Sequence, residues 1–293
     1  MATVKAPVTS ADRLAAAYRA MTAHWLEVIA ADVLAHWSPS HVRPGFLRIA
    51  LAALPNRLAL PPAQVIAEVG AEVDRKATAN FQRLIGLAPM RLRADAARVL
   101  QAGTLARDKK AKAKSRLERV GLTPEMGAAV ARFRRNNVER ITSLRAEQIA
   151  RVSELLDEAD ANGWRPEDLA ARLAKDVQTT TSRAELIARD QTLKLHADIQ
   201  QERQTQSGIR QYRWSTSADE RVRGTPGGKW PNGMHYDLDG QIFDWSDPPV
   251  TNSAGDRNHP GQDYQCRCIA IPILPSVEEM ALSGAAIDPL DDF

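Results

Sequence analysis

An apolar stripe with an eleven-residue period lies between residues 125 and 161, and it constrains the fold more than any other sequence feature. Its members form two sets that each step by eleven: Val130, Ile141 and Val152, and Phe133, Leu144 and Leu155. Eleven residues make three helical turns at about 3.67 residues each, so the stripe faces one partner along a nearly straight helix. Thr123-Pro124 gives this helix a start and Asn162-Gly163 an end. The sequence therefore predicts a long helix in a mainly helical chain.

More helices are predicted before the stripe. Apolar residues at steps of three and four predict an amphipathic helix over 10–37. A short helix is expected over 43–54, ending at Pro55 because proline disfavours helix in the residue before it. Pro61-Pro62 opens another helix, for which Gly86 is the expected end.

Two separate helices are predicted after the stripe. The first is short and covers 164–175. Ser182 and Glu185 then form a capping box, in which the side chain of each residue accepts a hydrogen bond from the free backbone N–H of the other. The helix that this box opens is expected to reach about Gln206.

The segment from Gly208 to Leu274 has a different character. A strand is expected over 210–216, a tight turn at Asp239-Gly240, a loop at His259-Pro260-Gly261, and a final apolar strand entered through Cys266-Arg267-Cys268. The predicted fold class is α+β and mainly α: a long-helix N-terminal region followed by a small β-rich C-terminal module.

Shifts in composition predict four parts of the chain. We expect a basic helical region (1–120), a scaffold of one long and one short helix (121–182), an α+β module (183–274) and an acidic C-terminal tail (275–293).

The totals exclude several classes of protein. The chain lacks an apolar run of about 18–20 residues, so no membrane-spanning helix is expected. Its first residues lack the apolar core of a secretory signal. The chain has two cysteines, and they are separated by one residue, a spacing that permits a disulfide only with strain. A reducing cytosolic origin is the simplest expectation.

Charge is distributed unevenly along the chain. Residues 1–120 carry 19 Lys and Arg against 9 Asp and Glu, whereas residues 121–293 carry 20 against 27. The basic residues concentrate in 91–119, and they include Arg107, Lys109, Lys110, Lys112, Lys114 and Arg116. These side chains could contact the phosphates of double-stranded DNA without sequence preference. The alternative is a basic helix face that is simply solvated.

The Gly208–Leu274 segment also contains a candidate zinc site. Cys266 and Cys268, with His235 and His259, supply the donors of a Cys₂His₂ set. Zinc sites usually use Cys-x₂₋₄-Cys, but residues i and i+2 of a strand do point to the same face. The alternative is that both thiols pack as small apolar groups while Arg267 projects from the opposite face.

A catalytic interpretation uses the same histidines. His235 or His259 would act as a general base, and Asp219, Asp237 or Asp239 would be its partner or a metal ligand of a hydrolase or nuclease. The sequence contains no nucleophile elbow, phosphate loop or zinc-protease motif to support it. The favoured interpretation is structural, with Asp219 paired to Arg221 or Arg223.

An ordered set of short motifs connects these residues. In chain order they are Arg183-Ala184-Glu185-Leu186-Ile187-Ala188-Arg189, Gly208-Ile209, Tyr212-x-Trp214, Asp219-x-Arg221-x-Arg223, a histidine, and Pro260-Gly261-x-x-Tyr264-x-Cys266-Arg267-Cys268. This set resembles the phage Mu F-like minor head proteins, which are head-morphogenesis proteins of tailed bacteriophages. The resemblance covers about residues 125–274 and is strongest over 183–274.

The resemblance implies a virion protein that is not an enzyme. Such a protein would be made in the host bacterial cytoplasm and would reside at the portal vertex or in the capsid interior. Its expected partners are the portal protein, other head proteins and packaged DNA, with no membrane, and it would assist head assembly and DNA packaging or delivery. No cofactor is implied, which leaves zinc as the open chemical question. The motif residues would be structural: Arg183, Glu185, Arg189, Asp219, Arg221, Arg223 and Arg267.

Overall fold

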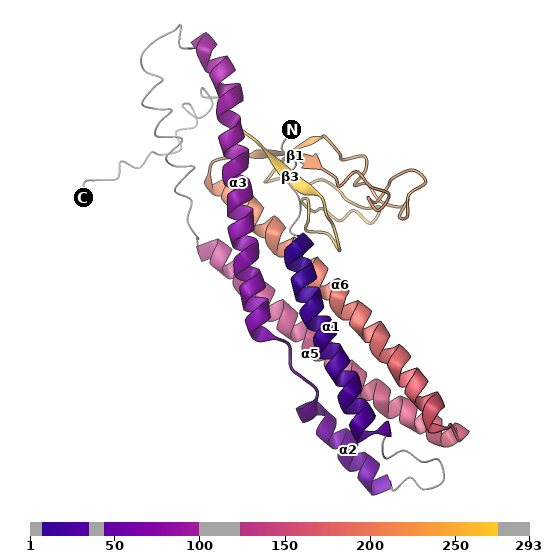
Figure 1. Ribbon diagram of the computed structural model, residues 1–293. Helices are drawn as coiled ribbons and strands as arrows, with labels where there is room; N and C mark the ends of the chain where they lie inside the picture. Colours follow the sequence, from indigo (N-terminus) through magenta and orange to yellow (C-terminus); the bar gives the residue numbers. More distant parts are fainter. Residues whose placement is uncertain (1–7, 35–43, 100–123, 275–293) are drawn as a thin grey trace, which may run out of the picture. The chain divides into compact units, whose positions relative to one another are not determined.

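The structure, a computed structural model, describes residues 8–34, 44–99 and 124–274, the side chains of 44–50 and 82–99 excepted. These residues form long helices followed by a small sheet (Figure 1), as the predicted fold class requires. The helices are α1 (Val8–Asp32), α2 (Pro44–Arg57), α3 (Ala63–Val99), α5 (Pro124–Asn162) and α6 (Pro166–Gln206). None of the described helices combines the length and the apolarity needed to cross a bilayer.

Two compact units divide the chain. The helical unit takes its described residues from 8–72 and 131–192. The β unit takes its described residues from 73–130 and 193–274. The basic side chains at 107–116 and the tail at 275–293 lie outside the described residues, so the predictions made for them stay predictions.

The eleven-residue stripe does form one helix. In α5 the side chains of Phe133, Ile141, Leu144, Val152 and Leu155 are buried, and Val130 is half-buried. The helix ends at Asn162, where Gly163 adopts a positive φ of 61°, the left-handed conformation that terminates many helices.

Polar pairs between helices fix the register within the helical unit, and one of them is fully buried. The Tyr18 hydroxyl of α1 donates to Asn137 Oδ1 of α5 at 2.8 Å, and both side chains are fully buried. The Thr181 hydroxyl of α6 donates to Thr22 Oγ1 at 2.8 Å. Because a buried polar group left without a partner costs about 1–3 kcal/mol, such pairs disfavour sliding of one helix along another.

The predicted break in α6 is wrong. The helix is continuous from Pro166 to Gln206 and therefore passes through the expected capping box. Ser182 does not cap a helix, since its hydroxyl donates to the carbonyl of Gln178 at 3.1 Å, one turn earlier. Thr179 makes the same backward bond to the carbonyl of Lys175 at 3.1 Å, and such bonds allow hydroxyl side chains to sit inside a helix. Glu185 instead binds Arg19 at 2.8 Å.

Two predicted helix ends are also wrong. The α2 helix includes Pro55 in its last turn and ends at Arg57. The buried side chains of Leu54 and Leu58 hold this turn in place. The α3 helix continues through Gly86 to Val99. An interior glycine costs a helix only about 1 kcal/mol, so Gly86 does not end one by itself.

The sheet of the β unit has three antiparallel strands in the order β2-β1-β3. Its strands are β1 (Gln211–Ser215), β2 (Ile242–Asp244) and β3 (Ile269–Ile273). Tyr212 and Trp214 of β1 are fully buried and alternate with the exposed Gln211 and Arg213, as the two-residue period of a strand requires. The sequence predicted β1 and β3 and missed the three-residue β2.

The sheet and its loops contact residues 193–206 of α6. Gln204 is fully buried and bridges two elements: its amide donates to the carbonyl of Ala270 at 3.0 Å, and its oxygen accepts the indole N–H of Trp245 at 3.2 Å. Figure 1 shows β1 and β3 beside this end of α6. The helix therefore provides the surface on which the small sheet and its loops are ordered.

Candidate metal centre

His235, Cys266 and Cys268 come together inside the β unit, although His235 precedes the cysteines by some thirty residues. His235 follows the glycine-containing loop 224–234, and the cysteines lie between a turn and β3. All three side chains are buried, with exposed fractions of 2–7%. They belong to the core that Tyr212, Trp214 and Trp245 form.

The imidazole of His235 faces both sulfur atoms. Its Nδ1 atom lies 3.5 Å from the Sγ atom of Cys266 and 3.5 Å from that of Cys268. The three donor atoms all lie within 4.8 Å of one another. The structure thus unites three of the four predicted zinc ligands.

His259, the fourth predicted ligand, lies outside this group. Its Nδ1 is 2.8 Å from the Tyr212 hydroxyl, and its ring packs on Trp245 with ring centroids 4.7 Å apart. Burial lowers its pKa. His259 therefore has a structural place in the aromatic core.

A bend before β3 turns the two sulfurs toward His235. Gln265 has a positive φ of 49°, and the amide of Cys266 donates to the carbonyl of Asp263 at 3.2 Å, which closes a turn. The cysteines thus precede the regular strand, contrary to the prediction of two strand positions. Arg267, between them, binds Asp219 at 2.6 Å.

Asp263 holds the other side of the imidazole. Its Oδ2 atom lies 3.1 Å from His235 Nε2, and Arg223 binds the same carboxylate oxygen. Arg223 also donates to the carbonyl of Tyr264. Asp263 was not among the residues predicted for the site, although an acidic residue three positions before the first cysteine can reach a ligand of that cysteine's site.

The electrostatics of the group favour a protonated His235 imidazole beside a Cys266 thiolate. Burial lowers the pKa of His235, but hydrogen bonds to Asp263 and Cys266 outweigh it and raise that pKa to about 9. A hydrogen bond from Cys268 and the proximity of His235 hold the pKa of the Cys266 thiol well below its usual range. The hydrogen bond to Cys266, together with burial, raises the pKa of Cys268.

The carboxylates expected to assist a catalytic histidine lie elsewhere. Asp219 binds Arg267 and the backbone amide of Arg221, and the Arg267 hydrogen bond lowers its pKa. Asp239 accepts the amide of Thr216 at 2.7 Å, and Asp237 is exposed. The expected side-chain pairing of Asp219 with Arg221 or Arg223 is wrong, because Arg267 takes that carboxylate and Arg223 takes Asp263.

The remaining motif residues belong to the helical unit. Arg183 binds Glu147 at 2.8 Å, and Arg189 lies 3.9 Å from Glu185. These pairs are largely solvent-exposed, so each contributes at most about 1 kcal/mol to stability.

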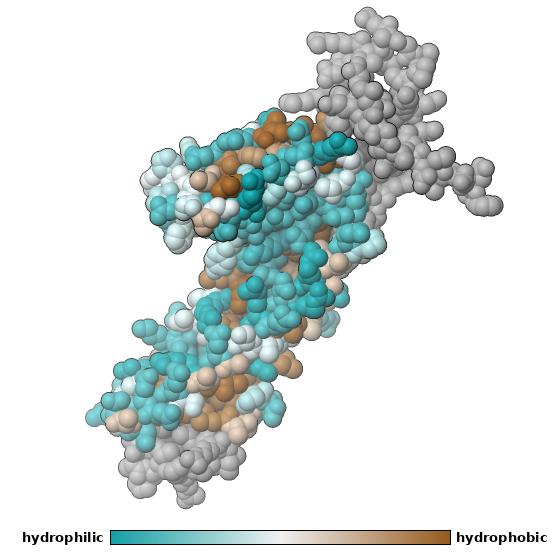
Figure 2. All heavy atoms as spheres, turned by 180° about the vertical axis from the view of Figure 1, so that it is seen from behind, coloured by the Kyte–Doolittle hydropathy of each residue, from teal (hydrophilic) through white to brown (hydrophobic). Residues whose placement is uncertain are grey.

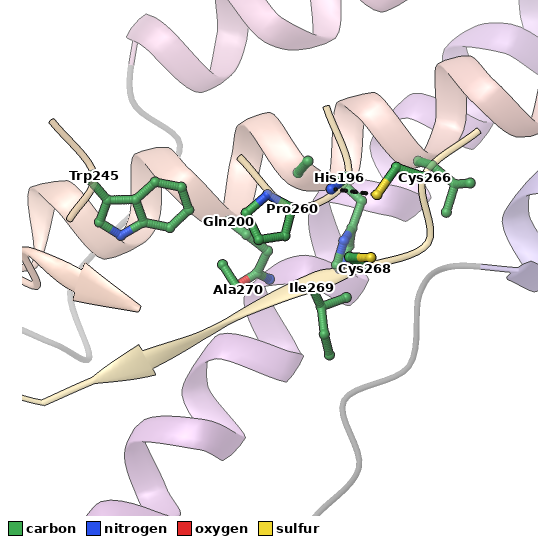
Figure 3. A pocket seen from close by; sticks show the side chains of 11 residues that line it. His196, Gln200, Trp245, Pro260, Cys266, Cys268, Ile269 and Ala270 are labelled. Carbon is green, nitrogen blue, oxygen red and sulfur yellow. Dashed lines mark hydrogen bonds between the residues drawn. The ribbon is translucent and has the colours of Figure 1, made fainter. Parts of the chain in front are cut away.

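A small cavity lies beside the two cysteines (Figure 3), and His196 and Gln200 of α6 also line it. Its volume is about 10 Å³, the lower limit for a single water molecule. Burial lowers the pKa of His196 to about 4, and its Nε2 atom has no hydrogen-bond partner among the described residues. Gly261 closes the cavity and donates its amide to Cys266 Sγ at 3.4 Å, the dashed contact in Figure 3.

Comparison with known proteins confirms the resemblance found in the motifs. Residues 150–271 match the model of the family described as Phage Mu protein F like protein. An uncharacterized protein of Haemophilus influenzae is 37% identical over 165 residues, which are 56% of this chain and 34% of the relative. The chain thus aligns with about a third of that relative's length. No solved structure matches the chain.

Proposed function

We propose that this chain, similar to the Phage Mu protein F like family over residues 150–271, is a minor head protein of a tailed phage. It would act at the portal vertex or capsid interior and assist head assembly and DNA packaging or delivery. The observation that carries the proposal is the family match, since it spans all of α6 and nearly all of the sheet. The motifs in that range have the order that minor head proteins show.

The contacts of the motif residues support a binding role. Arg223 and Arg267 each join segments about forty or more residues apart, through Asp263 and Asp219. Such pairs stabilise the fold of the β unit, as expected of a structural and docking part of a head protein. On the face drawn in Figure 2, hydrophilic residues (teal) surround smaller groups of hydrophobic ones (brown), and protein partners could dock there.

The alternative, a metal-dependent hydrolase or nuclease, fits the site poorly. A hydrolytic metal needs space for substrate next to its open coordination position. The cavity beside Cys266 and Cys268 holds about 10 Å³, too little for a nucleotide or a peptide. His259, the second histidine on which that alternative depends, is engaged with Tyr212.

Incorporation into procapsids tests the proposal. The chain would be co-expressed with the portal, scaffold and major capsid proteins of a tailed phage, and the procapsids would be separated by sedimentation. The chain should sediment with procapsids and be absent from particles assembled without the portal protein. A chain that stays in the soluble fraction whenever portal-containing procapsids form would refute the proposal.

A further inference from the structure

The distances from His235 Nδ1 to the sulfur atoms of Cys266 and Cys268 are those of a tetrahedral metal site. An ion bound at about 2.3 Å from sulfur and about 2.0 Å from nitrogen separates these two atoms by roughly 3.5 Å in tetrahedral geometry. Both N···S distances in the structure are 3.5 Å. A hydrogen bond between His235 and a thiol requires only one short N···S distance. An ion that all three residues bind requires both sulfur atoms to lie equally close to the nitrogen.

The surroundings of these donors also fit a metal. Metal-bound histidines usually give their other ring N–H to a carboxylate, which fixes the tautomer and the ring orientation. Here Asp263 takes His235 Nε2 at 3.1 Å and is itself held by Arg223, so Nδ1 is left to face the sulfurs. The amide of Gly261 donates to Cys266 Sγ, a bond that strengthens when the sulfur is a thiolate.

An indole N–H also becomes satisfied in the metal-bound state. Trp214 Nε1 is buried and has no partner of proper geometry among the described residues. The indole and the Cys268 side chain lie in the same buried core. A thiolate at Cys268 would offer this N–H a charged acceptor, whereas the neutral thiol is a weak one.

Charge and burial favour a bound metal over a disulfide or a catalytic cysteine at this site. Two thiolates and a neutral imidazole balance one divalent cation, so the buried group would carry no net charge. A disulfide between positions 266 and 268 would be strained, because near neighbours rarely reach the required geometry. A Cys266–His235–Asp263 nucleophile would need access for substrate, but Cys266 is 4% exposed beside a cavity of about 10 Å³.

We propose that His235, Cys266 and Cys268 bind one Zn²⁺ ion, which ties the loop that carries His235 to the chain entering β3. The cavity lined by Cys266, Cys268 and His196 has room for one water molecule. A sheet of three short strands has a small core, and a structural zinc site adds its binding free energy to folding. The site is independent of the proposed head function.

Metal content and a cobalt spectrum test the site in the full chain. Protein purified under reducing conditions without chelator should contain about one zinc per chain. After the zinc is removed with a chelator, added Co²⁺ should give the absorption of a tetrahedral ion with thiolate ligands. A wild-type protein that holds no zinc and shows no such spectrum with Co²⁺ would overturn the proposal.

Four variants separate the ligands from their neighbours. Cys266→Ser and Cys268→Ser should lose the thiolate–cobalt absorption stepwise, whereas His259→Gln should keep both zinc and the spectrum. Asp263→Asn should retain the spectrum at saturating Co²⁺ but bind Co²⁺ about 10–100-fold more weakly. Loss of a residue that only orients a metal ligand has an effect of this size. Rapid alkylation of both cysteines in the folded wild-type protein, or loss of metal only in His259→Gln, would contradict the assignment.

Discussion

His235 Nδ1 lies 3.5 Å from Cys266 Sγ although 31 positions separate the two residues in the chain. The intervening segment contains β2 and two long loops, so this contact closes most of the β unit around Trp214 and Trp245. The stability of these loops should therefore depend on what joins the imidazole to the thiols.

Chelation of zinc should destabilise the β unit. If zinc is present at 100 times its dissociation constant, it stabilises the folded state by about 2.7 kcal/mol. A chelator should lower the melting temperature of wild-type protein by several degrees and leave Cys268→Ser almost unaffected. Equal melting temperatures of wild-type protein with and without chelator would contradict this prediction, which calorimetry can check.

Gly261→Ala should be strongly destabilising. An added Cβ would lie 2.8 Å from the Cβ of Ala197 on α6, and the glycine has a φ of +86°. Backbone strain and the clash together should lower the free energy of unfolding by about 2–4 kcal/mol. Gly255→Ala is the matched control, because Gly255 has a φ of +87° with nothing within 4 Å of the added Cβ. The control should lose only about 1 kcal/mol, and equal losses in urea unfolding would argue against close packing on α6.

Acid should destabilise the protein through His196. Burial lowers the pKa of this histidine to about 4 from an ordinary value of 6.5. The unfolded chain therefore binds a proton more readily, so the stabilisation is full above pH 6.5 and is lost as the pH falls toward 4. His196→Leu should show a smaller decline in unfolding free energy between pH 7 and pH 4 than wild-type protein. The same substitution at the half-exposed His24 should leave the decline unchanged. Parallel curves for wild type and His196→Leu would contradict the prediction.

DNA binding, if residues 91–119 provide it, should depend on salt and ignore sequence. Reversing Lys109, Lys110 and Lys112 to Glu should weaken binding to double-stranded DNA and lower the salt slope by up to about 3, since each phosphate contact contributes about 0.9. Arg134, Arg135 and Arg140 are exposed on α5, and their reversal to Glu gives a control of equal charge. Fluorescence anisotropy at several salt concentrations distinguishes the two, and an equal loss in both variants would indicate only a net-charge effect.

The long helices could be predicted because their apolar stripes are periodic. The eleven-residue step of α5 and the three- and four-residue steps of α1 each leave a continuous buried face, and the structure buries those residues. The Ser-x-x-Glu motif at Ser182 led to a wrong prediction of a helix start, because the same motif also occurs inside helices. Only the backward hydroxyl bond to Gln178, a feature of the folded helix, distinguishes the two cases.

The candidate site could be predicted only in part. The residue types and the family motifs pointed to His235, Cys266 and Cys268. Whether His259 or another residue lies beside these three side chains depends on the paths of the loops, which no local sequence pattern encodes. Asp263 was missed because its role arises from the turn at Gln265, where a positive φ redirects the chain. His196 was missed because it lies on a regular helix and becomes notable only when the sheet packs over it.

The number of copies of this chain in each procapsid tests the head-protein account most directly. Quantitative mass spectrometry would compare particles assembled with and without the portal protein, with the major capsid protein as internal standard. The account predicts a few copies per portal-containing particle and none in particles that lack a portal. Copy numbers that match the shell protein, or that do not change when the portal is omitted, would contradict it.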